Sequence, residues 1–335
     1  MYGLLGLCLA LSALLTINAF ASLGAMLLWR GVSNFTCGWA SATRARFLFA
    51  LRIFPAMAAT ICVVAFLVPS YLAYEPRRTG EIVSAKLAAL ALLSAVGIAL
   101  AVWRGIAAWR ATRRLLADWM RRGEAIALAG VAIPAYRIEH RFPVIAVVGV
   151  IRPRLFIASR VLDALSTEEL KAAIAHEVGH LTARDNLKRW LIRACRDVLV
   201  IVPTGRALDR AWSEATEAAA DEYAAHAGAF SALDLAASLV KIARMAPAGA
   251  KSTMPVGAFL IGDDDMAGSI EARVHRLARI AEADGPPNDS QVVMRRATTW
   301  ICFSLLLVFV ALAATNPRVL AALHASIEQI VSALS

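Results

Sequence analysis

Four long runs of apolar residues dominate the hydrophobic pattern of this chain. They lie at residues 3–29, 47–74, 82–103 and 298–315. The first run contains no charged residue, the second contains only Arg52 and the third contains only Lys86. Each run is close to the roughly 20 residues that a helix needs to cross the hydrocarbon core of a bilayer. The pattern therefore predicts four transmembrane helices, with Arg52 and Lys86 reaching from near the helix ends toward the membrane interface.

The composition supports a membrane protein. Hydrophobic residues make up 59% of the 335 residues, whereas a soluble domain is usually about 45–50% apolar. A cleaved signal peptide is the alternative for the first run, but no positive charge precedes that run and it is too long. The five cysteines show no paired spacing, which argues against a disulfide framework and against a Cys-ligated zinc site.

The arginines between the apolar runs predict how the helices are oriented. The first loop carries Arg30, Arg44 and Arg46 without any acidic residue, and six more arginines follow the third run between residues 104 and 122. By the positive-inside rule, the first loop and the long middle region are cytoplasmic, and both ends of the chain are external. This is the layout of a multi-pass protein of a bacterial-type inner membrane. The formal net charge of +10 is mostly juxtamembrane arginine facing anionic lipid headgroups, so it requires no nucleic acid as a partner.

The sequence divides into residues 1–103 with three transmembrane helices, a cytoplasmic domain at 104–296, and 297–335 with the fourth transmembrane helix and a short external tail. The cytoplasmic domain opens with an amphipathic segment that is expected to lie along the membrane face. Residues 136–159 are rich in β-branched side chains and are broken by two prolines, which predicts two or three short strands. Ser166 and Glu169 then form the S-x-x-E pattern that begins a helix. Further helices are expected at about 185–202 and 207–228, followed by a loop at 246–268.

Two histidines in the helix after Ser166 have the spacing of a metal site. His176 and His180 are four residues apart, so both imidazoles project from one helical face and can hold a single zinc ion. Glu177 lies close enough to polarise a water molecule at such a site. Only about 0.004 matches to H-E-x-x-H are expected by chance from this composition. Two solvated or core histidines are the alternative.

A third ligand is expected from another helix, since a catalytic zinc ion usually has three protein ligands and one open position. The segment 212–225 offers four acidic residues: Glu214, Glu217, Asp221 and Glu222. Glu217 and Asp221 are again four residues apart, and the alanines around them would allow a close approach to the histidine helix. Glu214 and Glu222 are expected to be solvated. Asp263, Asp264 and Asp265 are also expected to be solvated rather than to bind a metal.

At these residues the chain resembles a known group of enzymes. H-E-x-G-H at 176–180, followed by E-x-x-A-D ending at Asp221, is similar to the gluzincin membrane peptidases, including the HtpX and CaaX-prenyl-protease group. Residues 147–186 resemble the BlaR/MecR-type family more closely, through a G-x-x-x-P strand at Gly149 and an R-D-N sequence ending at Asn186. Ala220 departs from the cysteine typical of that type. Only twenty residues follow Thr315, so the penicillin-binding sensor domain of its antibiotic sensors is expected to be absent.

The resemblance implies a mainly α membrane protein with four transmembrane helices and an α+β gluzincin-like zinc peptidase domain containing a small sheet. It implies one catalytic Zn²⁺ on His176, His180 and Glu217, with Glu177 as general base and proton shuttle. Asp221 would orient a ligand imidazole, and the strand at 147–151 would bind substrate along its edge. The oxyanion-stabilising group has no candidate, and Arg273 is expected to form a structural salt bridge.

The function expected from these features is a zinc endopeptidase acting on a cytoplasmic or membrane-proximal protein. The substrate would be a transcriptional repressor in a signalling version, or a misfolded membrane protein in a quality-control version. A signalling scaffold stabilised by zinc is the alternative, but a purely structural site would not need Glu177. A zinc transporter is disfavoured because the ligands lie outside the apolar runs. The sequence does not define the oligomeric state.

Overall fold

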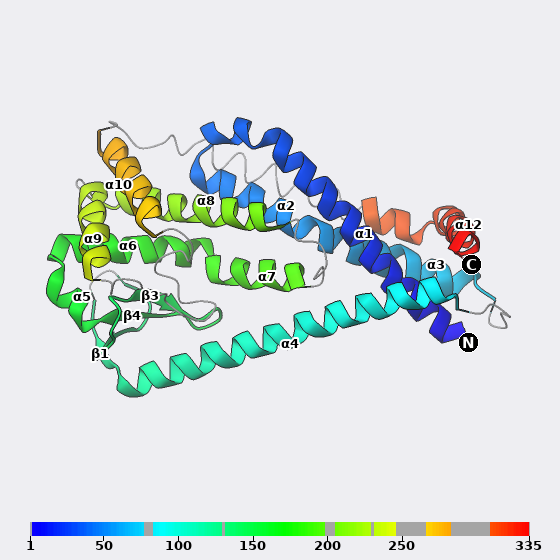
Figure 1. The fold of residues 1–335 in the computed structure, drawn as a ribbon, viewed down its shortest axis with the longest axis horizontal. Helices are drawn as coiled ribbons and strands as arrows, with labels where there is room; N and C mark the ends of the chain where they lie inside the picture. Colours follow the sequence, from blue (N-terminus) through cyan, green and yellow to red (C-terminus); the bar gives the residue numbers. More distant parts are fainter. Residues whose placement is uncertain are drawn as a thin grey trace.

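The computed structural model describes residues 2–76, 83–128, 131–197, 205–228, 231–245, 266–282 and 309–334. The described chain is mostly helical with one small mixed sheet. Figure 1 shows an elongated molecule in which the sheet and helices α5, α6, α9 and α10 gather at one end. Both ends of the chain lie at the opposite end, beyond the long helices α1 and α4. The fold therefore separates an apolar helical part from a mixed α and β part.

Three helices are long and apolar enough to cross a membrane, among the residues that the structure describes. They are α1 (Tyr2–Val32), the continuous helix Ser41–Tyr74 and α4 (Ala85–Arg122). The second of these consists of α2 (Ser41–Ile61), a π-helical stretch (Cys62–Leu67) and α3 (Val68–Tyr74). The first three predicted spans are thus helices of sufficient length. Most of the fourth predicted span, 298–315, lies outside the described residues, and α12 (Pro317–Leu334) follows it.

Helix α4 joins the third predicted span to the amphipathic segment that follows it. The helix has 38 residues and continues past residue 103, where the sequence suggested a division, until Gly123. Its last part carries exposed aromatic and basic side chains, with the Arg113 guanidinium 4.8 Å from the ring centre of Trp109. At about 1.5 Å per residue, α4 is long enough to cross a bilayer and then extend to the sheet, as Figure 1 shows.

The sheet has four strands in the order β1-β2-β4-β3. These are β1 (Glu124–Ile126), β2 (Ala135–Ile138), β3 (Ile145–Val148) and β4 (Arg154–Ala158). β2 and β4 are parallel, while β1 pairs with β2 and β3 pairs with β4 in antiparallel fashion. The expected strands within 136–159 are present as β2, β3 and β4. β3 lies at an edge of the sheet, and its four residues are buried.

Six described helices follow the sheet along the chain. They are α5 (Ser159–Ala164), α6 (Thr167–Ala183), α7 (Asp185–Asp197), α8 (Arg206–Ala225), α9 (Ser231–Met245) and α10 (Met266–Glu282). α6 begins with the predicted capping box: Glu169 N–H donates to Ser166 Oγ at 3.2 Å, and Ser166 N–H donates to Glu169 Oε2 at 2.7 Å. Helix α6 packs against β3, α8 and α9. This one capped helix therefore lies between the edge strand and α8 and contacts both.

The candidate membrane-spanning helices contact the mixed α and β part directly, through α2 and α8. Arg52 of α2 is buried, and its Nε donates to Asp209 Oδ1 of α8 at 2.8 Å. A carboxylate of the domain is thus the partner of Arg52, a contact that the sequence did not predict. Gly205 makes room for this contact, since a Cβ there would lie 2.7 Å from Arg52 Nη2. Lys86 is exposed near the start of α4, as expected.

Candidate metal centre

The two histidines of α6 lie side by side at its C-terminal end. The His176 and His180 ring centres are 4.8 Å apart, and the ring planes are perpendicular. Both side chains are largely buried. The four-residue spacing places them one turn apart on one face of the helix, as the sequence predicted.

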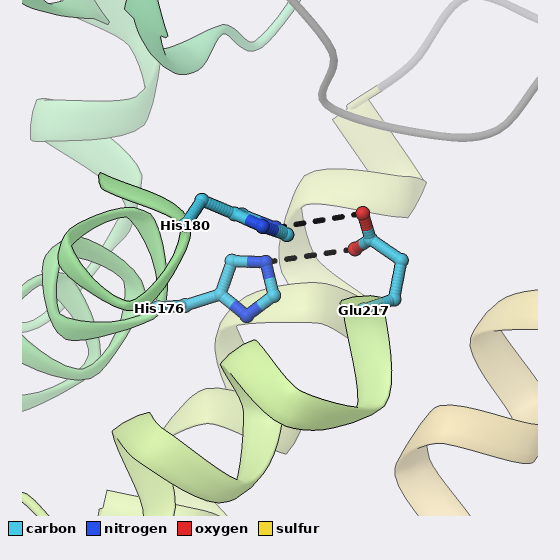
Figure 2. A group of neighbouring side chains, drawn as sticks. All are labelled: His176, His180 and Glu217. Atoms are coloured by element: carbon cyan, nitrogen blue, oxygen red, sulfur yellow. Dashed lines mark ion pairs between the residues drawn. The ribbon is translucent and has the colours of Figure 1, made fainter. Parts of the chain in front are cut away.

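Glu217 of α8 faces both imidazoles. Its Oε2 lies 3.6 Å from His176 Nε2, and its Oε1 lies 3.5 Å from His180 Nε2. Figure 2 shows the carboxylate opposite the two rings, with one oxygen toward each histidine. One potential ligand atom from each of the three residues lies within 4.8 Å of the others. The structure therefore brings together the three residues expected to bind zinc.

Small residues allow α6 and α8 to come this close. A Cβ at Gly179 would lie 3.2 Å from Tyr223 Cδ1 and 3.3 Å from Ala220 Cα. Such contacts are tighter than most real Cβ contacts, so a larger side chain at residue 179 would push the helices apart. Gly179 and Ala220 thus set the distance across which Glu217 reaches the histidines.

A second carboxylate lies at the other ring nitrogen of each histidine. His176 Nδ1 is 3.0 Å from Asp221 Oδ1, and His180 Nδ1 donates to Asp185 Oδ2 at 2.8 Å. A proton held on His180 Nδ1 leaves its Nε2 with a lone pair facing Glu217, which is the tautomer that a metal ligand needs. The contact of His176 Nδ1 with Asp221 has the distance of an ion pair but not the geometry of a hydrogen bond. This donor set of two imidazoles and one carboxylate suits a zinc ion. Asp221 has the position the sequence suggested, whereas the contact of Asp185 was not predicted.

Three arginines compensate the buried carboxylates. Arg273 of α10 donates to Asp221 through two nitrogens, Nε at 3.0 Å and Nη2 at 2.7 Å, and its Nη1 lies 3.2 Å from Glu217 Oε2. Arg276 also donates to Asp221, and Arg189 of α7 donates to Glu217 Oε1 at 3.3 Å. The salt bridge expected of Arg273 thus forms at the site itself. It anchors α10 beside the two acids of α8.

These contacts determine the charge of the site without a metal. Burial raises the pKa of Glu217, but the charges and hydrogen bonds of His180 and His176 and the charge of Arg273 outweigh it and hold that pKa well below its usual range. Burial lowers the pKa of His180, but Glu217 and Asp185 outweigh it and raise that pKa to about 9. Glu217 is therefore anionic, as a ligand must be. Metal binding would displace a proton from His180.

Glu177 lies in a different environment from Glu217. It is buried, and its Oε2 accepts a hydrogen bond from Val147 N–H of β3 at 3.2 Å. Burial raises its pKa above the usual value, against the opposing charges of the two histidines. A carboxylate with a raised pKa is a stronger base than an ordinary one. Its burial and position therefore suit a general base.

The edge strand is held in place by side chains on both sides of the histidines. The Asn186 side-chain N–H of α7 donates to Val147 O at 3.0 Å and to Gly149 O at 3.3 Å. Gly149 has φ +110°, and a Cβ there would lie 2.9 Å from Arg152 O. This turn therefore requires glycine, and it directs the chain from β3 back into β4.

The other acidic candidates do not join this group. Glu214 is exposed on α8, whereas Glu222 accepts a hydrogen bond from Ser41 of α2. Asp263, Asp264 and Asp265 lie outside the described residues. Of the four acids offered by the segment 212–225, only Glu217 and Asp221 reach the histidines among the contacts described.

Comparison with known proteins identifies a related family. A family model described as Peptidase family M48 matches residues 146–246. The matched segment begins in β3, covers α6 and α8, and contains the two histidines, Glu177, Glu217 and Asp221. No curated protein matches the chain. The family match covers about 100 of the 335 residues, and it supports a metallopeptidase domain within a helical membrane protein.

Proposed function

We propose that this chain is a membrane-embedded zinc endopeptidase that cleaves a cytoplasmic or membrane-proximal protein. The observation that carries the proposal is the arrangement around His176 and His180. Both Nε2 atoms face Glu217, and both Nδ1 atoms face an aspartate. An ion pair alone would not need two imidazoles oriented in the same way by separate carboxylates. A zinc ion held by these residues explains the arrangement.

The zinc ion and the side chains around it would have different roles in peptide hydrolysis. Zinc at such a site acts as a Lewis acid, which polarises the scissile carbonyl and makes water more acidic. Glu177 then accepts the proton of the attacking water and delivers it to the leaving nitrogen. Its raised pKa favours acceptance of that proton. Asp185 keeps the His180 imidazole in its ligand tautomer, and Asp221 pairs with His176.

Substrate would bind in extended form along β3. Val144 O accepts from Ala158 N–H of β4, so the backbone groups of Ile145 and Val147 face away from β4. At Val147 these groups already bond to Glu177 and Asn186, so a peptide added here would have to replace both contacts, directly beside the proposed base. A peptide added to this edge would therefore pass the histidine pair.

The location of the site supports a role at the cytoplasmic face of a bacterial-type inner membrane. The arginine distribution favours that face for the first loop and the domain, and α8 packs directly against α2. A BlaR/MecR-type signalling peptidase would cleave a transcriptional repressor there. A quality-control peptidase would instead cleave a membrane protein. A zinc-stabilised scaffold is the alternative, but it offers no reason for a buried glutamate beside the histidines.

The test is the Glu177→Gln variant, which keeps the size of the side chain and removes no proposed ligand. The full-length protein in detergent should retain the zinc content of the wild type and lose cleavage of an unfolded model protein such as casein. Glu168→Gln, on an exposed face of the same helix, is the matched control and should cleave normally. Cleavage by Glu177→Gln at the wild-type rate would contradict the assignment.

A further inference from the structure

Side chains of two helices occupy the outward edge of β3. Val147 N–H donates to Glu177 Oε2 of α6 at 3.2 Å, and Val147 O accepts from the side-chain amide of Asn186 on α7 at 3.0 Å. The same amide donates to Gly149 O at 3.3 Å. Three main-chain groups along the edge therefore have hydrogen-bond partners before any substrate binds.

The Asn186 amide makes contacts that an added antiparallel strand would make. Two carbonyls that lie two residues apart on one side of a strand accept from N–H groups that lie two residues apart on the neighbouring strand. The Asn186 amide has two hydrogens and supplies both donors from a single nitrogen. Glu177 Oε2 occupies the place of a substrate carbonyl at Val147 N–H. Together, the two side chains reproduce three hydrogen bonds of a bound peptide.

The start of α7 is fixed beside the site, whereas the Asn186 side chain can leave the edge. Asp185, the preceding residue, is buried and accepts a hydrogen bond from His180 Nδ1 at 2.8 Å. Asn186 itself is only partly buried. Its amide can reach water by rotation about side-chain bonds, which is a fast motion for a side chain that is not enclosed. The main chain of α7 therefore need not move when the amide leaves Val147 and Gly149.

We propose that Asn186 competes with the substrate main chain for the edge of β3 and so selects the peptide that enters the site. This proposal rests on the peptidase function proposed above. The peptide that replaces Asn186 is an extended, unfolded segment with two free N–H groups two residues apart. Proline has no N–H, so a segment with proline at either position would not replace the amide. The same peptide takes Val147 N–H from Glu177 and leaves that carboxylate free beside the histidines.

The competition has a calculable effect on substrate affinity. The apparent affinity of a site is reduced by the fraction of molecules in which the site is open. Removing the two hydrogen bonds of a neutral amide should therefore lower KM about two- to tenfold. The kcat should stay the same, because the described contacts of Asn186 are with β3 and not with a proposed zinc ligand. If Asn186 served only to hold β3 in place, its loss would instead loosen the edge and raise KM.

The test measures cleavage of fluorescein-labelled casein by full-length protein in detergent. Asn186→Leu keeps nearly the size of the side chain and removes both donors, so it should lower KM by this factor and leave kcat and zinc content unchanged. Asn186→Ala should have the same effect with a smaller side chain. Trp190→Phe, at an exposed position of the same helix, is the matched control and should have the KM of the wild type.

Binding can be measured separately from turnover in the Glu177→Gln background. The substituted side chain keeps an oxygen that can accept from Val147 N–H, so only the contribution of Asn186 is varied. Fluorescence anisotropy of the labelled casein gives its Kd without cleavage. Adding Asn186→Leu should lower this Kd by the same factor as the KM, whereas adding Trp190→Phe should not change it.

An unchanged or higher KM and Kd in both Asn186 variants would overturn the proposal and leave the peptidase function intact. Loss of zinc, or melting well below the wild type, in both variants would also overturn it, because Asn186 would then maintain the fold. A wild-type protein that does not cleave casein would count against the proposed function. In that case the binding comparison still decides whether Asn186 competes for the edge.

Discussion

Replacing Asp221 with alanine should destabilise the domain strongly. Asp221 is fully buried, and its carboxylate is shared by Arg273, Arg276 and His176. Removing one partner of a buried ion pair costs about 3–5 kcal/mol, because the other charge is left buried and unpaired. Arg273 would keep Glu217, which lies 3.2 Å from its Nη1, so we expect the lower part of this range, about 3 kcal/mol. At about 2–4 °C per kcal/mol, the melting temperature should fall by about 6–12 °C.

The assay is thermal unfolding of metal-free, full-length protein, followed by circular dichroism at one fixed scan rate. Glu168→Ala is the control, because it removes an exposed pair with Lys171 and should change stability by no more than about 0.5 kcal/mol. The double variant Asp221→Ala/Arg273→Leu should melt at a higher temperature than Asp221→Ala alone, since both buried charges are then absent. A single Asp221→Ala variant that melts within about 2 °C of the wild type would refute the reasoning.

Three further predictions concern packing, pH and topology. Gly179→Val should abolish zinc retention in metal analysis while Gly179→Ala weakens it, because any Cβ meets Tyr223 and the branched side chain meets it more severely. The pKa of Glu169 is lowered because Lys241 and Ser166 outweigh the effect of burial. The stability gained from its charge is therefore present above its ordinary pKa and lost as pH falls through the lower folded value. The difference in melting temperature between wild type and Glu169→Gln should accordingly be larger at pH 7 than at pH 3. Reporter fusions after residue 249 should be cytoplasmic and those after residue 335 external; a cytoplasmic signal at 335 would mean that 298–315 does not cross.

Sequence reasoning found the parts of the site that follow local helical spacing. His176 and His180 share a face because four residues make about one turn, and this holds wherever the helix lies. Glu217 is 37 residues beyond His180, but its alanine-rich surroundings indicated a close helix contact. The structure shows that contact at Gly179 and Ala220. Close packing of two helices thus leaves a pattern of small residues that can be read from the sequence.

Sequence reasoning missed contacts that depend on how the chain turns. Asp185 reaches His180 because Arg184 adopts a left-handed conformation with φ 55°, which ends α6 and redirects the chain. Only a few per cent of residues other than glycine adopt positive φ. The sequence therefore contains no pattern that predicts this turn. The pair of Arg52 with Asp209 was not predicted because the two residues are 157 positions apart. β1 has only three residues, too few for an alternating pattern.

The zinc site is tested most directly by a comparison of two glutamates of α8. Glu217 lies opposite both histidines, whereas Glu214, three residues earlier, is exposed. Zinc is measured in purified wild type, Glu217→Ala and Glu214→Ala after the same dialysis. We expect Glu217→Ala to contain one equivalent of zinc less than the wild type, and Glu214→Ala to contain the same amount as the wild type. Full zinc content in Glu217→Ala, or loss of the equivalent in Glu214→Ala, would contradict the assignment of the metal site.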